Sequence, residues 1–272
     1  MKQANVCLSI ALCLLAVVSS ACAPTGHPAS VRILFVGNSL TYVGNLPAVL
    51  EALSTSNGKS VSVEMLVKGG ATLTERANDS SVEREMNSAR YDFVVLQERG
   101  GDVFCFGDDS SGGDDCESSK AHVELGRVVL AHGAKPIVLG TYQSLESASQ
   151  TIEKQESALA KQMGAIYIPV SESFRLSQTL YTDNAWFNAD KTHPGPDLVL
   201  LEAVWLYSAI FDSPPTPQEL TVAAPIFGPG AHFVGSSLAS TQAVAAPATR
   251  YTYTMERVTD IVRIGTEPAI SH

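Results

Sequence analysis

The sequence predicts an α/β fold in three layers (α/β/α), with helices on both faces of a five-stranded parallel sheet. The first observation is a set of five short apolar runs that alternate with longer segments of helical character, at 31–36, 61–67, 92–97, 135–140 and 165–169. The second is the composition of the first run, Val31-Arg32-Ile33-Leu34-Phe35-Val36, which is typical of a strand buried on both faces. The third is length, because 272 residues suffice for one such domain and an appendage.

Helices are expected between the strands, and several have clear boundary residues. Pro47 favours the first turn of one helix, and Gly133 is a typical left-handed stop after another. The segment 196–211 is apolar almost all round, which predicts a buried helix; with Glu202 inside it, it is too short and too charged to span a membrane. The expected helices cover 45–57, 72–86, 118–132, 149–163, 172–180 and 196–211.

Residues 1–22 have the pattern of an export signal. Lys2 precedes a short apolar run, and the small residues Ser19-Ser20-Ala21-Cys22-Ala23 follow it. Two cleavage modes stay open: an ordinary signal peptidase would cut among the small residues, whereas lipoprotein processing would leave a lipid on Cys22. Both predict an exported bacterial protein that is secreted, periplasmic or anchored to the membrane through Cys22.

The rest of the chain is expected to divide into a core domain at 29–213 and a Pro/Ala-rich extension at 214–272. The run Ser213-Pro214-Pro215-Thr216-Pro217 marks the boundary, and 218–249 is expected to form loops with little regular structure. A final helix that packs back on the sheet is predicted from apolar residues at helical spacing, namely Tyr251, Met255, Val258 and Val262.

A Gly/Asp/Ser-rich insertion occupies 98–117 and contains Cys105 and Cys116. In an exported protein two cysteines in one polar loop predict a disulfide, which would stabilise the fold by about 3 kcal/mol. The aspartates of the insertion lack the ordered spacing of a calcium loop, and no Cys or His spacing in the chain resembles a zinc site, so no metal is expected. The insertion either forms part of a substrate rim or is a pinned surface loop.

The first strand ends in Gly37-Asn38-Ser39-Leu40, which delivers a serine to the carboxyl end of a central strand. Open α/β sheets bind ligands at that edge, so a hydroxyl there is well placed for nucleophilic chemistry. Asn38 or Ser39 could instead simply cap the next helix.

Asp190 and His193 lie three residues apart in a polar loop before the last core helix, and they favour the chemical interpretation. A serine hydroxyl needs a base to take its proton, and that base needs a third group to orient it. Of the six histidines, His193 alone has an aspartate at such a loop spacing. His193 is therefore the candidate base and Asp190 its orienting partner.

These residues resemble the SGNH (GDSL-type) hydrolases. Gly37-Asn38-Ser39-Leu40 is similar to their first block, Lys68-Gly69-Gly70-Ala71-Thr72-Leu73 to the second, and Asp190-x-x-His193-Pro194 to the last. Asn38 replaces the usual aspartate, as in a GNS-type branch. The usual third block, Gly-x-Asn-Asp, is absent, and Gln97 takes the place of its asparagine.

The resemblance implies a flavodoxin-like fold and an esterase mechanism. Ser39 would attack the acyl carbon, with His193 as general base and then general acid. The backbone N–H groups of Ser39 and Gly70 and the Gln97 amide would form the oxyanion hole. Activity should rise from acid to neutral pH as the imidazole loses its proton, and the chemistry requires no cofactor and no metal.

The substrate is expected to be a small-molecule or glycan ester with a short acyl group such as acetyl, because the chain shows no long apolar lid. Trp186 and Tyr42 are candidates to line the pocket, although core packing would also account for both. A net charge of −10 disfavours nucleic acid as a partner. Two alternatives stay open: an exported binding protein whose catalysis has lapsed, and an O-acyltransferase that uses the same serine.

Overall fold

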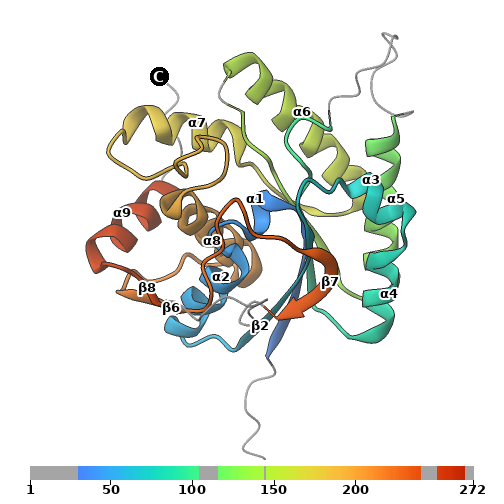
Figure 1. Ribbon diagram of the computed structural model, residues 1–272, viewed down its shortest axis with the longest axis horizontal. Helices are drawn as coiled ribbons and strands as arrows, with labels where there is room; N and C mark the ends of the chain where they lie inside the picture. The colour runs from blue at the N-terminus through green and yellow to red at the C-terminus, as the bar shows by residue number, and fades with distance from the viewer. Residues whose placement is uncertain (1–29, 104–115, 144, 240–249, 267–272) are drawn as a thin grey trace, which may run out of the picture.

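The computed structural model describes residues 30–103, 116–143, 145–239 and 250–266, and its central element is a six-stranded sheet (Figure 1). Five strands are parallel, as predicted, and they follow the order 2-1-3-4-5 of flavodoxin-like folds. The sixth strand pairs antiparallel with β2 at one edge. From edge to edge the strands are β5 (Ile166–Ile168), β4 (Lys135–Leu139), β3 (Phe93–Leu96), β1 (Val31–Gly37), β2 (Val61–Lys68) and β7 (Val234–Ala239).

Helices cover both faces of the sheet, and the alternation of side chains along β1 shows why. Ile33 and Phe35 point into the core beneath α2 and α8, whereas Leu34 and Val36 point into the core beneath α4 and α5. All four side chains are fully buried. The helices are α1 (Ser39–Tyr42), α2 (Leu46–Ser56), α3 (Leu73–Asn78), α4 (Ser81–Ser88), α5 (Glu117–Ala131), α6 (Glu146–Met163), α7 (Ser171–Leu180), α8 (Pro196–Phe211) and α9 (Met255–Thr266).

Most of the expected helices are confirmed, and two differ. The segment expected as one helix over 72–86 forms two, α3 and α4, because the chain turns at Asp79 and Ser80. Ser80 has a left-handed backbone with φ of 52°, and the Asp79 carboxylate accepts a hydrogen bond from the Ser81 N–H at 2.8 Å. Helix α6 begins at Glu146, earlier than expected.

The prediction of loops at 218–249 was wrong at 220–223 and 234–239, which form strands, and 240–249 lie outside the described residues. Two short strands, β6 (Leu220–Ala223) and β8 (Arg250–Tyr253), pair antiparallel, and β7 joins the main sheet. Strand β6 is only four residues long, with Leu220 and Val222 buried and Thr221 and Ala223 exposed. So short an alternation is a weak signal in a sequence. A final helix is present as α9, but it packs on α8 and not on the sheet as expected, and Tyr251 lies in β8.

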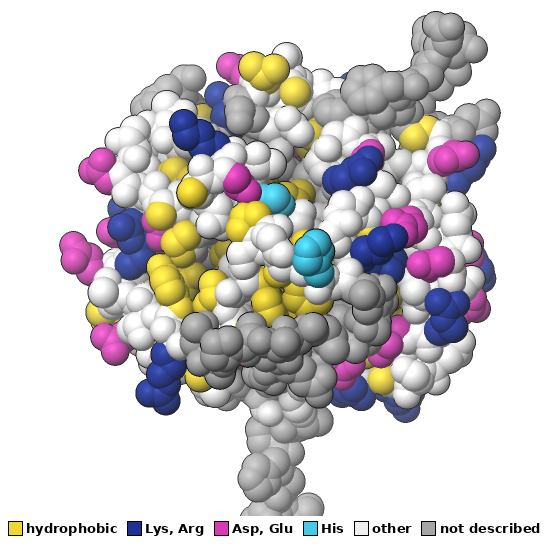
Figure 2. Space-filling model, in the orientation of Figure 1, with side chains coloured by type: hydrophobic (Ala, Val, Ile, Leu, Met, Phe, Trp, Pro, Cys, Tyr) yellow, Lys and Arg dark blue, Asp and Glu magenta, His cyan; other side chains and the backbone are white. Residues whose placement is uncertain are grey.

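The helices and the surface of the described residues have the following properties. No helix within the described ranges is long and apolar enough to cross a bilayer. Figure 2 shows a face on which acidic and basic side chains are interspersed around a central apolar area, with histidine side chains beside it. The predicted export signal and Cys22 lie outside the described residues.

Candidate active site

A cavity of about 300 Å³ opens at the carboxyl edge of the parallel sheet. It brings together Ser39 from the exit of β1, Gly70 from the exit of β2 and His193 from the loop before α8. Each of the three residues belongs to a different one of the sequence blocks that resemble the SGNH hydrolases. The full lining consists of Asn38, Ser39, Leu40, Gly70, Arg99, Gly100, Tyr142, Gln143, Phe187, Lys191, Thr192 and His193.

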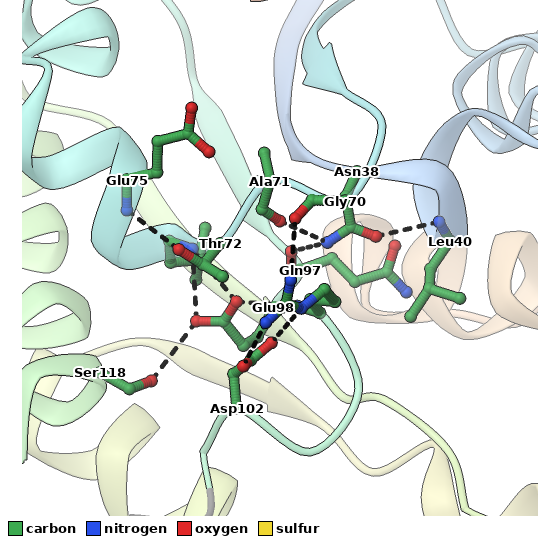
Figure 3. Close-up of polar contacts among 12 residues, drawn as sticks. Asn38, Leu40, Gly70, Ala71, Thr72, Glu75, Gln97, Glu98, Asp102 and Ser118 are labelled. Atoms are coloured by element: carbon green, nitrogen blue, oxygen red, sulfur yellow. Dashed lines mark hydrogen bonds and ion pairs between the residues drawn. The ribbon is translucent and has the colours of Figure 1, made fainter. Parts of the chain in front are cut away.

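Asn38 fixes the turn that presents Ser39. Its side-chain oxygen accepts a hydrogen bond from the Leu40 N–H at 3.0 Å, which caps α1. Its amide nitrogen donates to the carbonyls of Ala71 at 3.2 Å and Gln97 at 3.4 Å (Figure 3). An ionised aspartate could not make these two donor contacts. Asparagine therefore ties the exit of β1 to the exits of β2 and β3.

Gly37 is required because the chain turns back closely after β1. A Cβ atom built at this position would collide with the hydroxyl of Thr41 in α1. That hydroxyl donates to the Gln97 side-chain oxygen at 2.6 Å, so it cannot move away without losing a buried hydrogen bond. The tight turn holds Ser39 as the first residue of α1.

Asp190 holds the imidazole of His193 in one orientation. Its Oδ2 lies 2.6 Å from His193 Nδ1, and its Oδ1 accepts the backbone N–H groups of Thr192 and His193, both at 3.0 Å. The backbone N–H of His193, that of Thr192 and then the imidazole lower the pKa of Asp190 to about 2. The carboxylate is therefore ionised at neutral pH. Because it accepts from Nδ1, Nε2 is the nitrogen available for proton transfer.

The loop that carries this pair is held by its own backbone. Asn188 N–H donates to His193 O at 2.9 Å, and Gly195 N–H donates to Trp186 O at 2.8 Å. Gly195 is needed there because a Cβ would collide with the backbone of Ala185 and Phe187. No hydrogen bond joins the side chains of Ser39 and His193 in the described part of the chain. Such bonds are often long in ligand-free sites and shorten when substrate binds.

The two other predicted oxyanion-hole groups lie in different places. Gly70 lines the cavity, with a left-handed φ of 70° that favours glycine. Gln97 is 1% exposed and is not among the lining residues, because its side chain turns toward α1 and accepts the Thr41 hydroxyl. Its amide nitrogen is buried without a hydrogen-bond partner among the described residues.

The two predicted pocket aromatics belong to the core, not to the cavity lining. Trp186 packs edge-on against Phe174, and its indole N–H donates to Tyr181 O at 2.8 Å. Tyr42 packs against Phe233. Phe187, the neighbour of Trp186, lines the cavity instead. Cys105 lies outside the described residues, so its pairing with Cys116 stays a prediction.

Glu98, which was not predicted from the sequence, is a buried carboxyl group next to the lining residue Arg99. Its carboxylate accepts the backbone N–H groups of Leu73 at 3.1 Å and Arg99 at 2.8 Å, and the Ser118 hydroxyl at 3.4 Å (Figure 3). Burial raises the pKa of Glu98 to about 7. The signal available in the sequence was its position, directly after the third strand.

Arg99 and Tyr142 were also missed, and both line the cavity. The Arg99 guanidinium forms a two-point ion pair with Asp102, at 2.6 and 2.8 Å, and donates to Gly70 O at 3.3 Å. The Tyr142 hydroxyl donates to Thr192 O at 2.9 Å, which ties the exit of β4 to the histidine loop. The residues 99–100 of the insertion thus belong to the rim, while 104–115 lie outside the described residues.

No group of His, Cys, Asp and Glu side chains suited to a metal ion occurs within the described ranges. Ser39 and His193 line one cavity, and Asp190 Oδ2 lies 2.6 Å from His193 Nδ1, so the three residue types used in acyl transfer by a serine occur together here.

Comparisons with known proteins agree with the fold. No protein-family model matches the chain, and no curated protein matches it. Among solved structures, it is similar to a DUF4886 family protein from Bacteroides uniformis, with a TM-score of 0.55 and 13% identity over 68% of this chain and 84% of that one. The acetyl xylan esterase AlAXEase gives a TM-score of 0.54 and 15% identity over 66% of this chain and 100% of that one.

A third solved structure, the esterase EstA from Pseudoalteromonas sp., gives a TM-score of 0.51 and 13% identity over 66% of this chain and 97% of that one. At these identities the likeness concerns the fold alone. The chain therefore has the three-layer fold that known esterases use, which agrees with its resemblance to the SGNH hydrolases.

Proposed function

We propose that this protein is an exported serine esterase of the SGNH type, in the branch with asparagine before the nucleophile. The observation that carries the proposal is that Ser39 and the Asp190-oriented His193 line one cavity at the carboxyl edge of the sheet. Export rests on the signal-like residues 1–22.

The reaction proceeds in two halves. His193 takes the proton of the Ser39 hydroxyl as its oxygen attacks the acyl carbon, and the tetrahedral oxyanion accepts the backbone N–H groups of Ser39 and Gly70. The C–O bond to the alcohol then breaks, and His193 gives its proton to the leaving oxygen. Water, activated by His193, hydrolyses the acyl-serine. The negative charge of Asp190 stabilises the imidazolium in both halves.

The substrate class follows from the size of the cavity. About 300 Å³ is at the low end for small-molecule pockets, which favours a short acyl group such as acetyl. One structure of similar fold is named an acetyl xylan esterase, and an exported enzyme meets polysaccharides outside the cell. We therefore propose an O-acetylated carbohydrate as the substrate.

The test is hydrolysis of 4-nitrophenyl acetate by wild type, Ser39→Ala and His193→Ala, with Ser88→Ala as a matched control on the exposed surface of α4. Both site variants should lose kcat by about a thousandfold or more, because each removes a member of one reacting unit. Ser88→Ala should retain wild-type kcat, and circular dichroism should show that all variants are folded.

The position of Gln97 favours one alternative, a binding protein on the same fold. Without the Gln97 amide in the cavity, the oxyanion would rely on backbone donors alone. Equal rates for wild type and Ser39→Ala would favour that alternative over the esterase.

A further inference from the structure

The charges that face the cavity differ from those of the whole protein. The chain carries a net charge of −10, and acidic side chains occur among basic ones on the face shown in Figure 2. The described residues that line the cavity nevertheless include two cations, Arg99 and Lys191, and no carboxylate. Arg99 comes from the exit of β3 and Lys191 from the histidine loop, so two separate segments supply positive charge to one small space.

The two cations differ in their pairing, because Arg99 forms an ion pair with Asp102 and Lys191 forms none among the described residues. Asp102 and Asp190 are absent from the lining. Asp190 is engaged by the imidazole and by two backbone N–H groups, and Asp102 accepts both donors of Arg99. The charge of Arg99 is thus largely balanced by Asp102, and Lys191 supplies the unpaired positive charge in the lining.

Lys191 is placed there by an uncommon backbone. Its φ of 58° lies in the left-handed region, which glycine and asparagine adopt more easily than lysine. Its own N–H donates to Asn188 O at 2.9 Å, so the turn is fixed. The side chain is exposed and has no ion-pair partner among the described residues, which leaves its ammonium group available to a ligand.

We propose that the ester hydrolysed at this site carries a carboxylate on its alcohol part, as an acetylated acidic sugar does, and that Lys191 and Arg99 select it. This inference rests on the proposed esterase. The charge belongs on the alcohol part because the small cavity holds a short acyl group next to Ser39, and the larger alcohol must then reach the rim where the two cations lie.

The experiment compares two acetate esters that differ in charge, 3-acetoxybenzoate and 3-acetoxybenzamide. The meta position keeps the carboxylate away from the ester, so it cannot assist the hydrolysis itself. The readout is the ratio of kcat/KM for the anionic ester to that for the neutral ester. Variants are Lys191→Gln, Lys191→Glu and, as a charge-matched control, Lys161→Gln on the exposed surface of α6.

Wild type should prefer the anionic ester, and Lys191→Gln should lower the ratio by about two- to fivefold, the range for one exposed cation. Lys191→Glu should lower it further, and Lys161→Gln should leave it unchanged. Raising the ionic strength should reduce the ratio of wild type more than that of Lys191→Gln, because exposed charges are screened by salt. Arg99 is left intact because its replacement would also free Asp102 and the Gly70 loop.

A wild-type ratio of one or less would overturn the proposal while leaving the esterase in place, and so would a ratio that is the same in wild type and both Lys191 variants. An equal fall in Lys161→Gln would also overturn it, because the effect would then come from the general field of the protein. If folded wild type hydrolyses neither ester, the esterase assignment itself fails, and the proposal fails with it.

Discussion

At the scale of single residues, Asp190 has the best-defined role in the site. It accepts three hydrogen bonds from the loop that it belongs to, and these lower its pKa to about 2. The stabilisation that it contributes is present above its unfolded pKa of about 3.9 and is lost as pH falls toward 2. Through the whole neutral range Asp190 is therefore a fixed negative charge beside the imidazole of His193.

Asp190→Asn should reduce kcat/KM by about a hundredfold or more, with little change in fold. The amide can still accept backbone N–H groups, but it has lost the charge that stabilises the imidazolium and can impose the wrong tautomer on His193. The measurement is kcat/KM for 4-nitrophenyl acetate between pH 5 and 9, with circular dichroism as the control. Wild-type activity in a folded Asp190→Asn protein would show that the charge of Asp190 is not needed for catalysis.

Single residues also show where sequence reasoning succeeds and where it stops. Ser39 and His193 could be placed because each sits at a boundary that the apolar pattern defines. The direction of the Gln97 side chain could not be predicted, because it depends on a hydrogen bond with Thr41, which lies 56 positions earlier. The Thr41 hydroxyl donates to the side-chain oxygen of Gln97. The burial of Glu98 depends in the same way on contacts with α3 and α5.

At the scale of elements, Glu98 links three of them. It follows β3, accepts the first N–H of α3 and accepts the Ser118 hydroxyl of α5. Burial raises its pKa to about 7, against about 4.3 in an unfolded chain. The folded state therefore binds this proton more tightly, and ionisation of Glu98 lowers stability as pH rises from about 4.3 through 7.

Glu98→Gln should consequently gain in melting temperature relative to wild type as pH rises from 5 to 8. The variant has no carboxyl group at this position to ionise. It therefore keeps the stability that wild type loses as Glu98 ionises between pH 5 and 8. Thermal unfolding followed by circular dichroism at both pH values measures the difference. Glu156, whose pKa burial also raises to about 7, supplies a matched variant, Glu156→Gln, for which the same sign is expected. A constant difference between Glu98→Gln and wild type would contradict this account.

At the scale of the whole molecule, the five parallel strands of the sheet could be predicted from the sequence. The antiparallel strand β7 at one side of the sheet could not. The five parallel strands are mostly apolar, a pattern that buried strands share regardless of their partners. Strand β7 belongs to the sheet because it pairs with β2, which lies far away in the sequence. Strands β6 and β8 likewise stabilise each other across the chain. Such pairings depend on distant partners and leave little local signal.

The same architecture brings three chain segments to one cavity, and the central claim is that Ser39 is the nucleophile there. The most direct measurement is labelling with a fluorophosphonate probe, followed by mass spectrometry of the peptides. We predict one adduct on Ser39 in the folded wild-type protein and a strong loss of labelling in His193→Ala, with Ser88→Ala labelled as wild type. An adduct on another serine, or an unlabelled Ser39 in folded protein, would contradict the claim.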